Sequence, residues 1–157
     1  KYDTGDYEVV DPCFGDEADF KALCAAAKKR NISILLDGVF SHTGADSRYF
    51  NRYGTYPSVG AYQSPDSPYA KWYRIDPRTG KYDSWWGIDT LPNVNETEPS
   101  FLNFIVNGDD SVVAHYLRSG ASGWRLDVAD ELPMEFIHAL RLRAKAEGAQ
   151  NCVIGEV

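Results

Sequence analysis

The sequence predicts an α/β fold in which the strands of a parallel sheet alternate with helices, with a long irregular segment after the first strand. On both sides of that segment, short apolar runs follow stretches with the periodicity of a helix. Residues 43–99 show no such periodicity, and 11 of the 21 aromatic residues fall within residues 49–86. Strand–helix alternation predicts right-handed βαβ units on a parallel sheet. An irregular segment of this length is typical of a functional loop or a small subdomain.

The first helix and the first strand are predicted within residues 16–40. Acidic residues open the helix and Lys28, Lys29 and Arg30 close it, which complements the helix dipole. The apolar residues recur at the spacing of one helix face: Phe20, Leu23, Cys24 and Ala27. Residues Ile32–Phe40 follow and are apolar on both sides, as is typical of a parallel strand buried by helices.

Two more helix–strand units are predicted after the irregular segment. The first has a helix around residues 113–117 and a strand at Trp124–Ala129. The second has a helix around residues 136–144, between a proline and a glycine, and a strand at Cys152–Val157. The pattern therefore contains three strands of one parallel sheet.

Charge and composition argue against several classes of function. The formal net charge of −7 repels phosphate backbones and anionic lipid, so the sequence predicts neither a nucleic-acid partner nor a membrane-surface partner. No apolar run approaches the ~20 residues of a membrane span. Cys13, Cys24 and Cys152 have the spacing of neither a disulfide framework nor a metal site, which favours the cytoplasm over secretion.

Each predicted strand is followed or ended by polar residues that a buried strand does not need. These residues are Asp37, His42, Arg125, Asp127 and Glu156. Because active sites in parallel α/β folds gather at the carboxyl ends of the strands, we expect these side chains to converge.

Two of the carboxyl groups suggest complementary chemical roles. Arg125 and Asp127 are two residues apart, so both point to the same face of a strand, and the cation should lower the pKa of Asp127 and suit it to act as a nucleophile. Glu156, in a drier setting, would have a raised pKa and donate a proton. Such a pair is what glycoside hydrolysis requires. Taken singly, the Arg–Asp pair also fits a structural ion pair, Glu156 a solvated strand end, and His42 a loop cap.

The sequence resembles the alpha-amylase family of glycoside hydrolases, in the order of its short signature blocks. The segments that carry the resemblance are residues 2–7, 11–15, 36–42, 91–95, 123–131 and 154–156. The form Gly-Trp-Arg-Leu-Asp-Val at residues 123–128 and Trp-Trp-Gly at residues 85–87 are most similar to the neopullulanase, cyclomaltodextrinase and amylopullulanase branch.

This resemblance implies part of a (β/α)8 TIM barrel, about strands three to five with their helices. Residues 1–42 would form a barrel segment, residues 43–99 an inserted aromatic-rich domain, and residues 100–157 a second barrel segment. The sequence would then be a catalytic-domain fragment. Its open barrel edges favour self-association into a homo-oligomer, and we expect it to be inactive by itself.

The resemblance also implies catalytic roles. Asp127 would be the nucleophile that forms a glycosyl-enzyme intermediate, and Glu156 would be the general acid and then the base. Arg125 would orient Asp127 and keep it ionised.

The other matching positions would bind the α-glucan or maltooligosaccharide substrate. His42 would hydrogen-bond the sugar and Tyr2 would stack on it, while Asp37 would help to order the site. Asp130 and Glu131 would lie toward the leaving group or the acceptor. Aromatic residues of the inserted segment would either stack on sugar rings or form a small aromatic core.

No cofactor is predicted with certainty, and the structural calcium ion of the family is doubtful in this sequence. The family commonly binds a structural Ca²⁺ through an Asn in its first block, but this sequence has Ser41 there, a poorer ligand. The fourth block, a His-Asp pair that carries the family's third catalytic carboxylate, is not among these residues.

The predicted function is that of a retaining α-glucan hydrolase that acts on starch, pullulan, cyclodextrins or maltooligosaccharides. One alternative is a transglycosylase or isomerase of the same family, and another is a non-catalytic carbohydrate-binding or transport relative. The sequence does not distinguish α-1,4 from α-1,6 preference.

Overall fold

The computed structural model describes residues 2–157, and these form two compact units. The first joins the described residues up to Asp6 to Val39–Phe101, and the second joins Tyr7–Gly38 to Leu102–Val157. The predicted segment 1–42 is therefore divided between the units. Backbone hydrogen bonds explain the division, because Gly44 N–H donates to Thr4 O at 3.0 Å and Arg48 N–H donates to Gly5 O at 2.8 Å.

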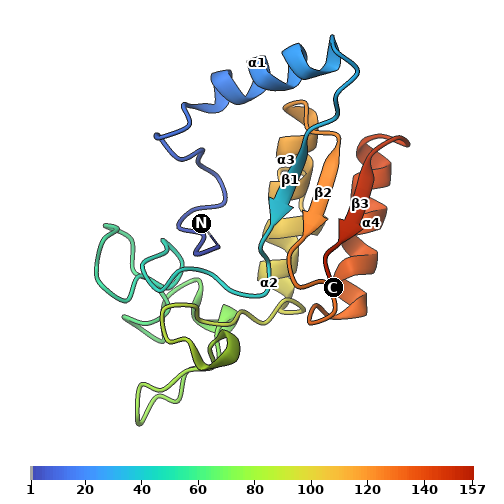
Figure 1. Ribbon diagram of the computed structural model, residues 1–157. Coiled ribbons are helices and arrows are strands. Elements are labelled where there is room, and N and C mark those ends of the chain that lie inside the picture. The colour runs from blue at the N-terminus through green and yellow to red at the C-terminus, as the bar shows by residue number, and fades with distance from the viewer. Residues whose placement is uncertain (1) are drawn as a thin grey trace. The chain divides into compact units, whose positions relative to one another are not determined.

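The second unit is built on a three-stranded parallel sheet, as predicted (Figure 1). Its strands are β1 (Leu35–Gly38), β2 (Gly123–Leu126) and β3 (Cys152–Gly155), and β2 lies between the other two. The register pairs Asp37 with Arg125. The central position of β2 therefore places Arg125 beside residues of both neighbouring strands.

All three strands are shorter than predicted. The predictions Ile32–Phe40 and Cys152–Val157 contain β1 and β3 and extend beyond them, whereas Trp124–Ala129 begins one residue after the start of β2 and extends past its end. The ladder between β1 and β2 ends at Gly38 and Leu126, after which the chain turns at residues 127–131. The first strand was predicted too long because Val39 and Phe40, which follow β1, are apolar and buried although they are not in a strand.

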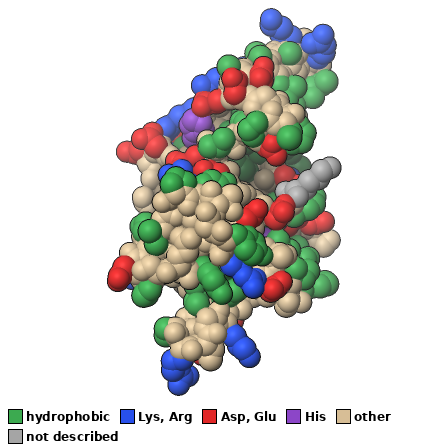
Figure 2. Space-filling view, turned by 90° about the vertical axis from the view of Figure 1, so that its left-hand side faces the viewer, with side chains coloured by type: hydrophobic (Ala, Val, Ile, Leu, Met, Phe, Trp, Pro, Cys, Tyr) green, Lys and Arg blue, Asp and Glu red, His purple; other side chains and the backbone are tan. Residues whose placement is uncertain are grey.

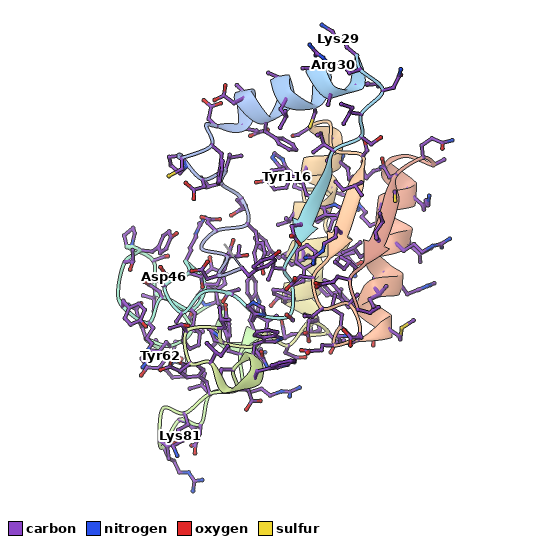
Figure 3. The ribbon with its side chains drawn as sticks, viewed as in Figure 1. Lys29, Arg30, Asp46, Tyr62, Lys81 and Tyr116 are labelled. Atoms are coloured by element: carbon purple, nitrogen blue, oxygen red, sulfur yellow. The ribbon has the colours of Figure 1, made fainter. Side chains whose placement is uncertain are left out.

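The predicted helices are confirmed as α1 (Glu17–Lys28), α3 (Val112–Arg118) and α4 (Met134–Glu147). The Asp16 carboxylate caps α1 by accepting the N–H groups of Ala18 and Asp19. Lys29 and Arg30, labelled in Figure 3, follow the other end of α1, and basic side chains gather there in the space-filling view (Figure 2). Both ends of α1 thus carry the charges that its dipole favours.

The core of the second unit lies where α3 and α4 pack together against the sheet. Phe136 and Leu140 of α4 and Val113 of α3 are fully buried, and the ring of Tyr116 meets that of Trp124 in β2 at 6.2 Å. Leu23, predicted on the buried face of α1, is 54% exposed. The sequence analysis also missed the short α2 (Pro99–Leu102) and the π-helical turn η3 (Asn103–Asn107) that follows it.

The first unit contains little regular structure and is held together by aromatic residues. Residues 43–98, all described, contain two short 3₁₀ turns, η1 (Ala70–Trp72) and η2 (Trp85–Gly87). Phe50 is fully buried, and its ring lies 4.8 Å from that of Tyr73 and 4.7 Å from that of Tyr82. The buried aromatic residues of this segment, Tyr49, Phe50, Trp72 and Tyr73, therefore form a small core that replaces the packing of helices and strands.

Among residues 2–157, the structure contains no helix with both the length and the apolar character needed to cross a membrane.

Candidate active site

One arginine of the second unit binds three carboxylates. Arg125 Nη1 lies 2.6 Å from Asp37 Oδ1 and 2.8 Å from Asp127 Oδ1, while Nη2 lies 2.9 Å from Glu156 Oε2. These four residues were all predicted as site residues, and the structure brings them together. Two charge-assisted hydrogen bonds, to Asp37 and Asp127, and an ion pair with Glu156 hold the three carboxylates around one planar group.

The sheet explains why these side chains meet. Asp37 is in β1, Arg125 is in β2, and Asp127 and Glu156 directly follow the ends of β2 and β3. The backbone continues its pairing past the strands, since Asp127 N–H donates to Gly38 O at 3.1 Å and Glu156 N–H donates to Leu126 O at 2.9 Å. The site therefore lies at the carboxyl ends of the parallel strands, where such folds place catalytic groups.

Asp127 is the most buried of the three carboxylates, with a side chain that is 10% exposed. Burial raises its pKa above the ordinary value, although the hydrogen bond and the charge of Arg125 oppose that effect. The prediction that the pKa of Asp127 is lowered is wrong, because the loss of hydration outweighs the cation. The pKa of Arg125 is raised, first by its hydrogen bond to Asp37, so the guanidinium stays charged.

Glu156 does not occupy the drier setting that was predicted for it. Its side chain is 50% exposed, whereas Asp127 is buried. The reason is its position after β3, an outer strand of the sheet within residues 2–157. The two carboxyl groups do differ in environment, but in the opposite sense to the prediction.

The sequence analysis missed Val128. Its φ of 42° is in the left-handed region, which is rare for a β-branched residue. Its N–H donates to Glu156 Oε2 at 3.2 Å, so it contacts the same carboxylate oxygen that Arg125 binds. Valine is not a residue that signals a left-handed turn, and nothing in the pattern could have revealed this.

His42 and Tyr2 lie together in the first unit. His42 is 1% exposed, and its Nε2 lies 2.9 Å from the carbonyl oxygen of Tyr2. Since a carbonyl only accepts, Nε2 carries the proton, and in the neutral ring Nδ1 accepts from Ser41 Oγ at 2.8 Å. Both ring nitrogens of His42 therefore contact protein atoms, which agrees with the alternative that His42 caps a loop. The sugar contacts of His42 and Tyr2 stay predictions.

Asp130 and Glu131 belong to the turn that follows β2 and are both exposed. Their predicted place on the leaving-group or acceptor side stays a prediction.

Ser41 stands where the family commonly has a calcium-binding Asn, and its surroundings do not favour the ion. Ser41 Oγ is engaged with His42, and Asn93 Oδ1 is a single buried oxygen without a hydrogen-bond partner. Among residues 2–157, no group of three or more His, Cys, Asp or Glu residues has the arrangement of a metal site. Calcium takes six to eight oxygen ligands, and this donor set falls far short of that number.

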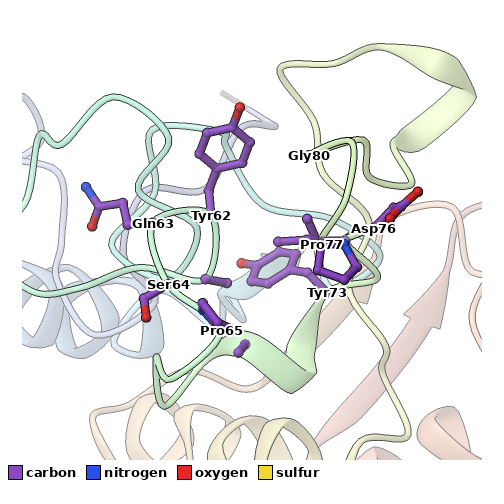
Figure 4. Close-up of a pocket in the computed structure, with 11 residues that line it drawn as sticks. Tyr62, Gln63, Ser64, Pro65, Tyr73, Asp76, Pro77 and Gly80 are labelled. Carbon is purple, nitrogen blue, oxygen red and sulfur yellow. The ribbon is translucent and has the colours of Figure 1, made fainter.

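The first unit also has a pocket of about 280 Å³, lined mostly by apolar groups (Figure 4). Tyr73 and Pro77 are among its walls. The carboxylate of Asp76 turns away from it in Figure 4 and accepts the N–H of Arg78 at 2.9 Å. None of the predicted site residues lines this pocket.

Comparisons with known proteins agree on one family. The family model of the alpha-amylase catalytic domain matches residues 1–150. An amylopullulanase from Thermoanaerobacterium thermosulfurigenes is 44% identical in an alignment 154 positions long that covers 87% of this chain. A cyclomaltodextrinase from Geobacillus thermopakistaniensis is 30% identical in an alignment 165 positions long, gaps included, that covers the whole chain. A crystal structure of a debranching enzyme from Nostoc punctiforme superimposes with a TM-score of 0.82 at 32% identity, covering 99% of this chain.

The chain spans only part of each of these proteins: 8% of the amylopullulanase, 26% of the cyclomaltodextrinase and 33% of the debranching enzyme. The family match nevertheless extends over nearly all of its residues, and the parallel sheet has the strand–helix alternation of a TIM barrel. The chain therefore belongs to the alpha-amylase catalytic-domain family, and its three-stranded sheet is part of that family's barrel.

Proposed function

We propose that this chain supplies the nucleophile and the acid/base of a retaining glycoside hydrolase that acts on α-glucans. The single observation that supports the proposal best is the bridging of Asp127 and Glu156 by one guanidinium. Oxygens bound to the two terminal nitrogens of one planar group are necessarily close. Retaining hydrolysis needs two carboxyl groups at about 5–5.5 Å, whereas inversion needs them farther apart.

In the first step, an Asp127 carboxylate oxygen attacks the anomeric carbon from the face opposite the leaving group. The bond from that carbon to the glycosidic oxygen breaks, and Glu156 gives its proton to this oxygen. In the second step, the Glu156 carboxylate takes a proton from water. The water oxygen attacks the anomeric carbon, and Asp127 leaves as a carboxylate.

The arrangement of the residues supports catalysis over a purely carbohydrate-binding role. A binding relative needs neither the nucleophile nor the acid, yet both are present and both contact Arg125. An α-glucan substrate is supported by the names of the relatives, an amylopullulanase and a cyclomaltodextrinase. A cytoplasmic location is supported by the three unpaired thiols, Cys13, Cys24 and Cys152.

The stereochemistry of the first-formed product tests the proposal. The complete protein that contains residues 1–157 is incubated with maltooligosaccharides and followed by proton NMR before mutarotation. We expect the α-anomer to form first. Initial release of the β-anomer, or no hydrolysis of starch, pullulan, cyclodextrins and maltooligosaccharides, would show that the proposal is wrong.

Azide can then assign the two carboxylates with an activated substrate such as α-maltosyl fluoride. With Asp127→Ala, azide should displace fluoride directly and give the β-glycosyl azide. With Glu156→Ala, azide should attack the covalent intermediate and give the α-glycosyl azide. Asp66→Asn is the matched control, because Asp66 is an exposed carboxylate of the first unit. That variant should hydrolyse starch like the unsubstituted protein and give no azide product.

A further inference from the structure

The turn that follows Asp127 adopts a conformation that valine rarely takes. Val128 has a φ of 42°, where its branched side chain crowds the backbone. Strain of this kind persists only where neighbouring contacts hold it, and it is concentrated at functional sites. The Val128 carbonyl accepts the N–H of Glu131 at 2.9 Å, and its N–H is directed to Glu156.

Two backbone N–H groups of the turn reach Glu156. Val128 N–H donates to the carboxylate oxygen Oε2 at 3.2 Å, and Ala129 N–H donates to the backbone carbonyl at 2.8 Å. The φ of Val128 sets the direction of the next N–H relative to its own, so a right-handed Val128 would point the Ala129 N–H in another direction. The left-handed turn therefore fixes both the backbone and the side chain of Glu156.

The turn approaches β3 so closely that only glycine fits at residue 155. A Cβ at Gly155 would lie 2.9 Å from the Cβ of Ala129, closer than two such carbons come in practice. The φ of Gly155 is not in the left-handed region, so the contact with Ala129 is what requires glycine. The absence of a side chain at Gly155 thus leaves room for the methyl group of Ala129, directly before Glu156 in the sequence.

We propose that Val128, Ala129 and Gly155 are positioning residues for the acid/base Glu156, an inference that rests on the function proposed above. Oε2 accepts the N–H of Val128 and forms the ion pair with Arg125 Nη2. This leaves Oε1 to carry the proton, which passes to the glycosidic oxygen as the bond from that oxygen to the anomeric carbon breaks. Residues 127–129 thus contain the nucleophile Asp127 and, directly after it, the two N–H groups that bind Glu156.

The test uses Gly155→Ala and the size-swapped pair Gly155→Ala with Ala129→Gly in the complete protein. The two substrates are maltohexaose, whose leaving group needs a proton, and α-maltosyl fluoride, whose leaving group needs little help. We expect Gly155→Ala to lower kcat/KM for maltohexaose by about 10²-fold and for the fluoride by much less. The size-swapped pair should restore kcat/KM for maltohexaose to within a few-fold of the unsubstituted protein.

Two further variants complete the design. Gly148→Ala is the matched control, since its added Cβ would meet only the Asn151 amide, at 3.0 Å, and that side chain can move. Val128→Gly keeps the N–H and permits the left-handed turn without strain, so it should keep the ratio of the two substrates' kcat/KM values and raise the thermal midpoint.

Equal losses on both substrates, no loss in Gly155→Ala, or no recovery in the size-swapped pair would each overturn the inference. A changed substrate ratio in Val128→Gly would do the same. Failure of the proposed function would look different, because the unsubstituted protein would then hydrolyse neither substrate, or Glu156→Gln would affect both alike.

Discussion

Glu96 in the first unit makes the stability of the protein depend on pH in a direction unusual for a carboxylate. Burial raises its pKa from the ordinary 4.5 to about 7, against smaller opposing effects of a backbone hydrogen bond and of Arg74. A raised folded-state pKa means that the folded protein binds the proton more tightly than the unfolded chain does. The contribution to stability is therefore fully present below pH 4.5 and is lost as the pH rises through 7.

The size of this effect follows from the two pKa values. At ~1.4 kcal/mol for each tenfold change in the proton equilibrium, the difference between 4.5 and about 7 corresponds to a ceiling of ~3 kcal/mol. Glu96 is only partly buried, so screening by solvent reduces the expected loss to ~1–2 kcal/mol. Glu96→Gln cannot ionise. It should match the unsubstituted protein near pH 4.5 and exceed its free energy of unfolding by that amount at pH 8.5.

Urea unfolding at a series of pH values measures the effect directly. Glu98→Gln is the opposing control: burial alone would raise the pKa of Glu98, but hydrogen bonds from Ser100 and Phe101 hold it below the ordinary value. Its contribution to stability is present at neutral pH and lost on acidification, so Glu98→Gln should destabilise the protein at pH 8.5. If Glu96→Gln gave the same difference in stability at all pH values, the reasoning would be refuted.

Three further predictions concern the site and the first unit. Arg125→Lys should lower kcat by about 10²-fold with little change in KM, because one ammonium cannot bind three carboxylates as the guanidinium does; an unchanged kcat would contradict this. Trp86 is 79% exposed and stacks on Trp85. Trp86→Ala should therefore raise KM for maltooligosaccharides and change the free energy of unfolding by less than ~0.5 kcal/mol. An unaltered KM in steady-state assays would count against stacking of Trp86 on the sugar. Chelation with EDTA should leave the thermal midpoint unchanged, whereas a crystal structure with Ca²⁺ at ~2.3–2.6 Å from Ser41 Oγ would overturn our interpretation.

The sequence was sufficient to predict the three strands, the helices α1, α3 and α4, and the carboxylates that meet at Arg125. Periodicity places a helix reliably when its face repeats, as in α4, where the buried Phe136, Leu140 and Ala144 recur at helical spacing. Strand ends were less predictable. Apolar residues such as Val39 and Phe40 are buried whether or not they are hydrogen-bonded to a neighbouring strand.

The environment of each carboxylate was not predictable from its neighbours in the sequence. The pair Arg125 and Asp127 predicted a lowered pKa, since proximity to a cation can be read from spacing. The burial of Asp127 depends on residues that are distant in sequence, and burial is the larger effect. The exposure of Glu156 likewise depends on β3 being an outer strand of the sheet within residues 2–157.

The charges around Arg125 suit the reaction better than a neutral cluster would. One guanidinium faces three carboxyl groups, so the cluster keeps a net negative charge even while Glu156 holds the proton that it donates and Asp37 and Asp127 are ionised. Glycoside cleavage passes through an oxocarbenium-like transition state, whose positive charge such a cluster stabilises. Burial alone would favour a protonated and therefore non-nucleophilic Asp127, and it would also remove the negative charge nearest to the sugar. The hydrogen bond from Arg125 opposes that protonation, so the residue that contacts all three carboxylates also favours the charged form of Asp127.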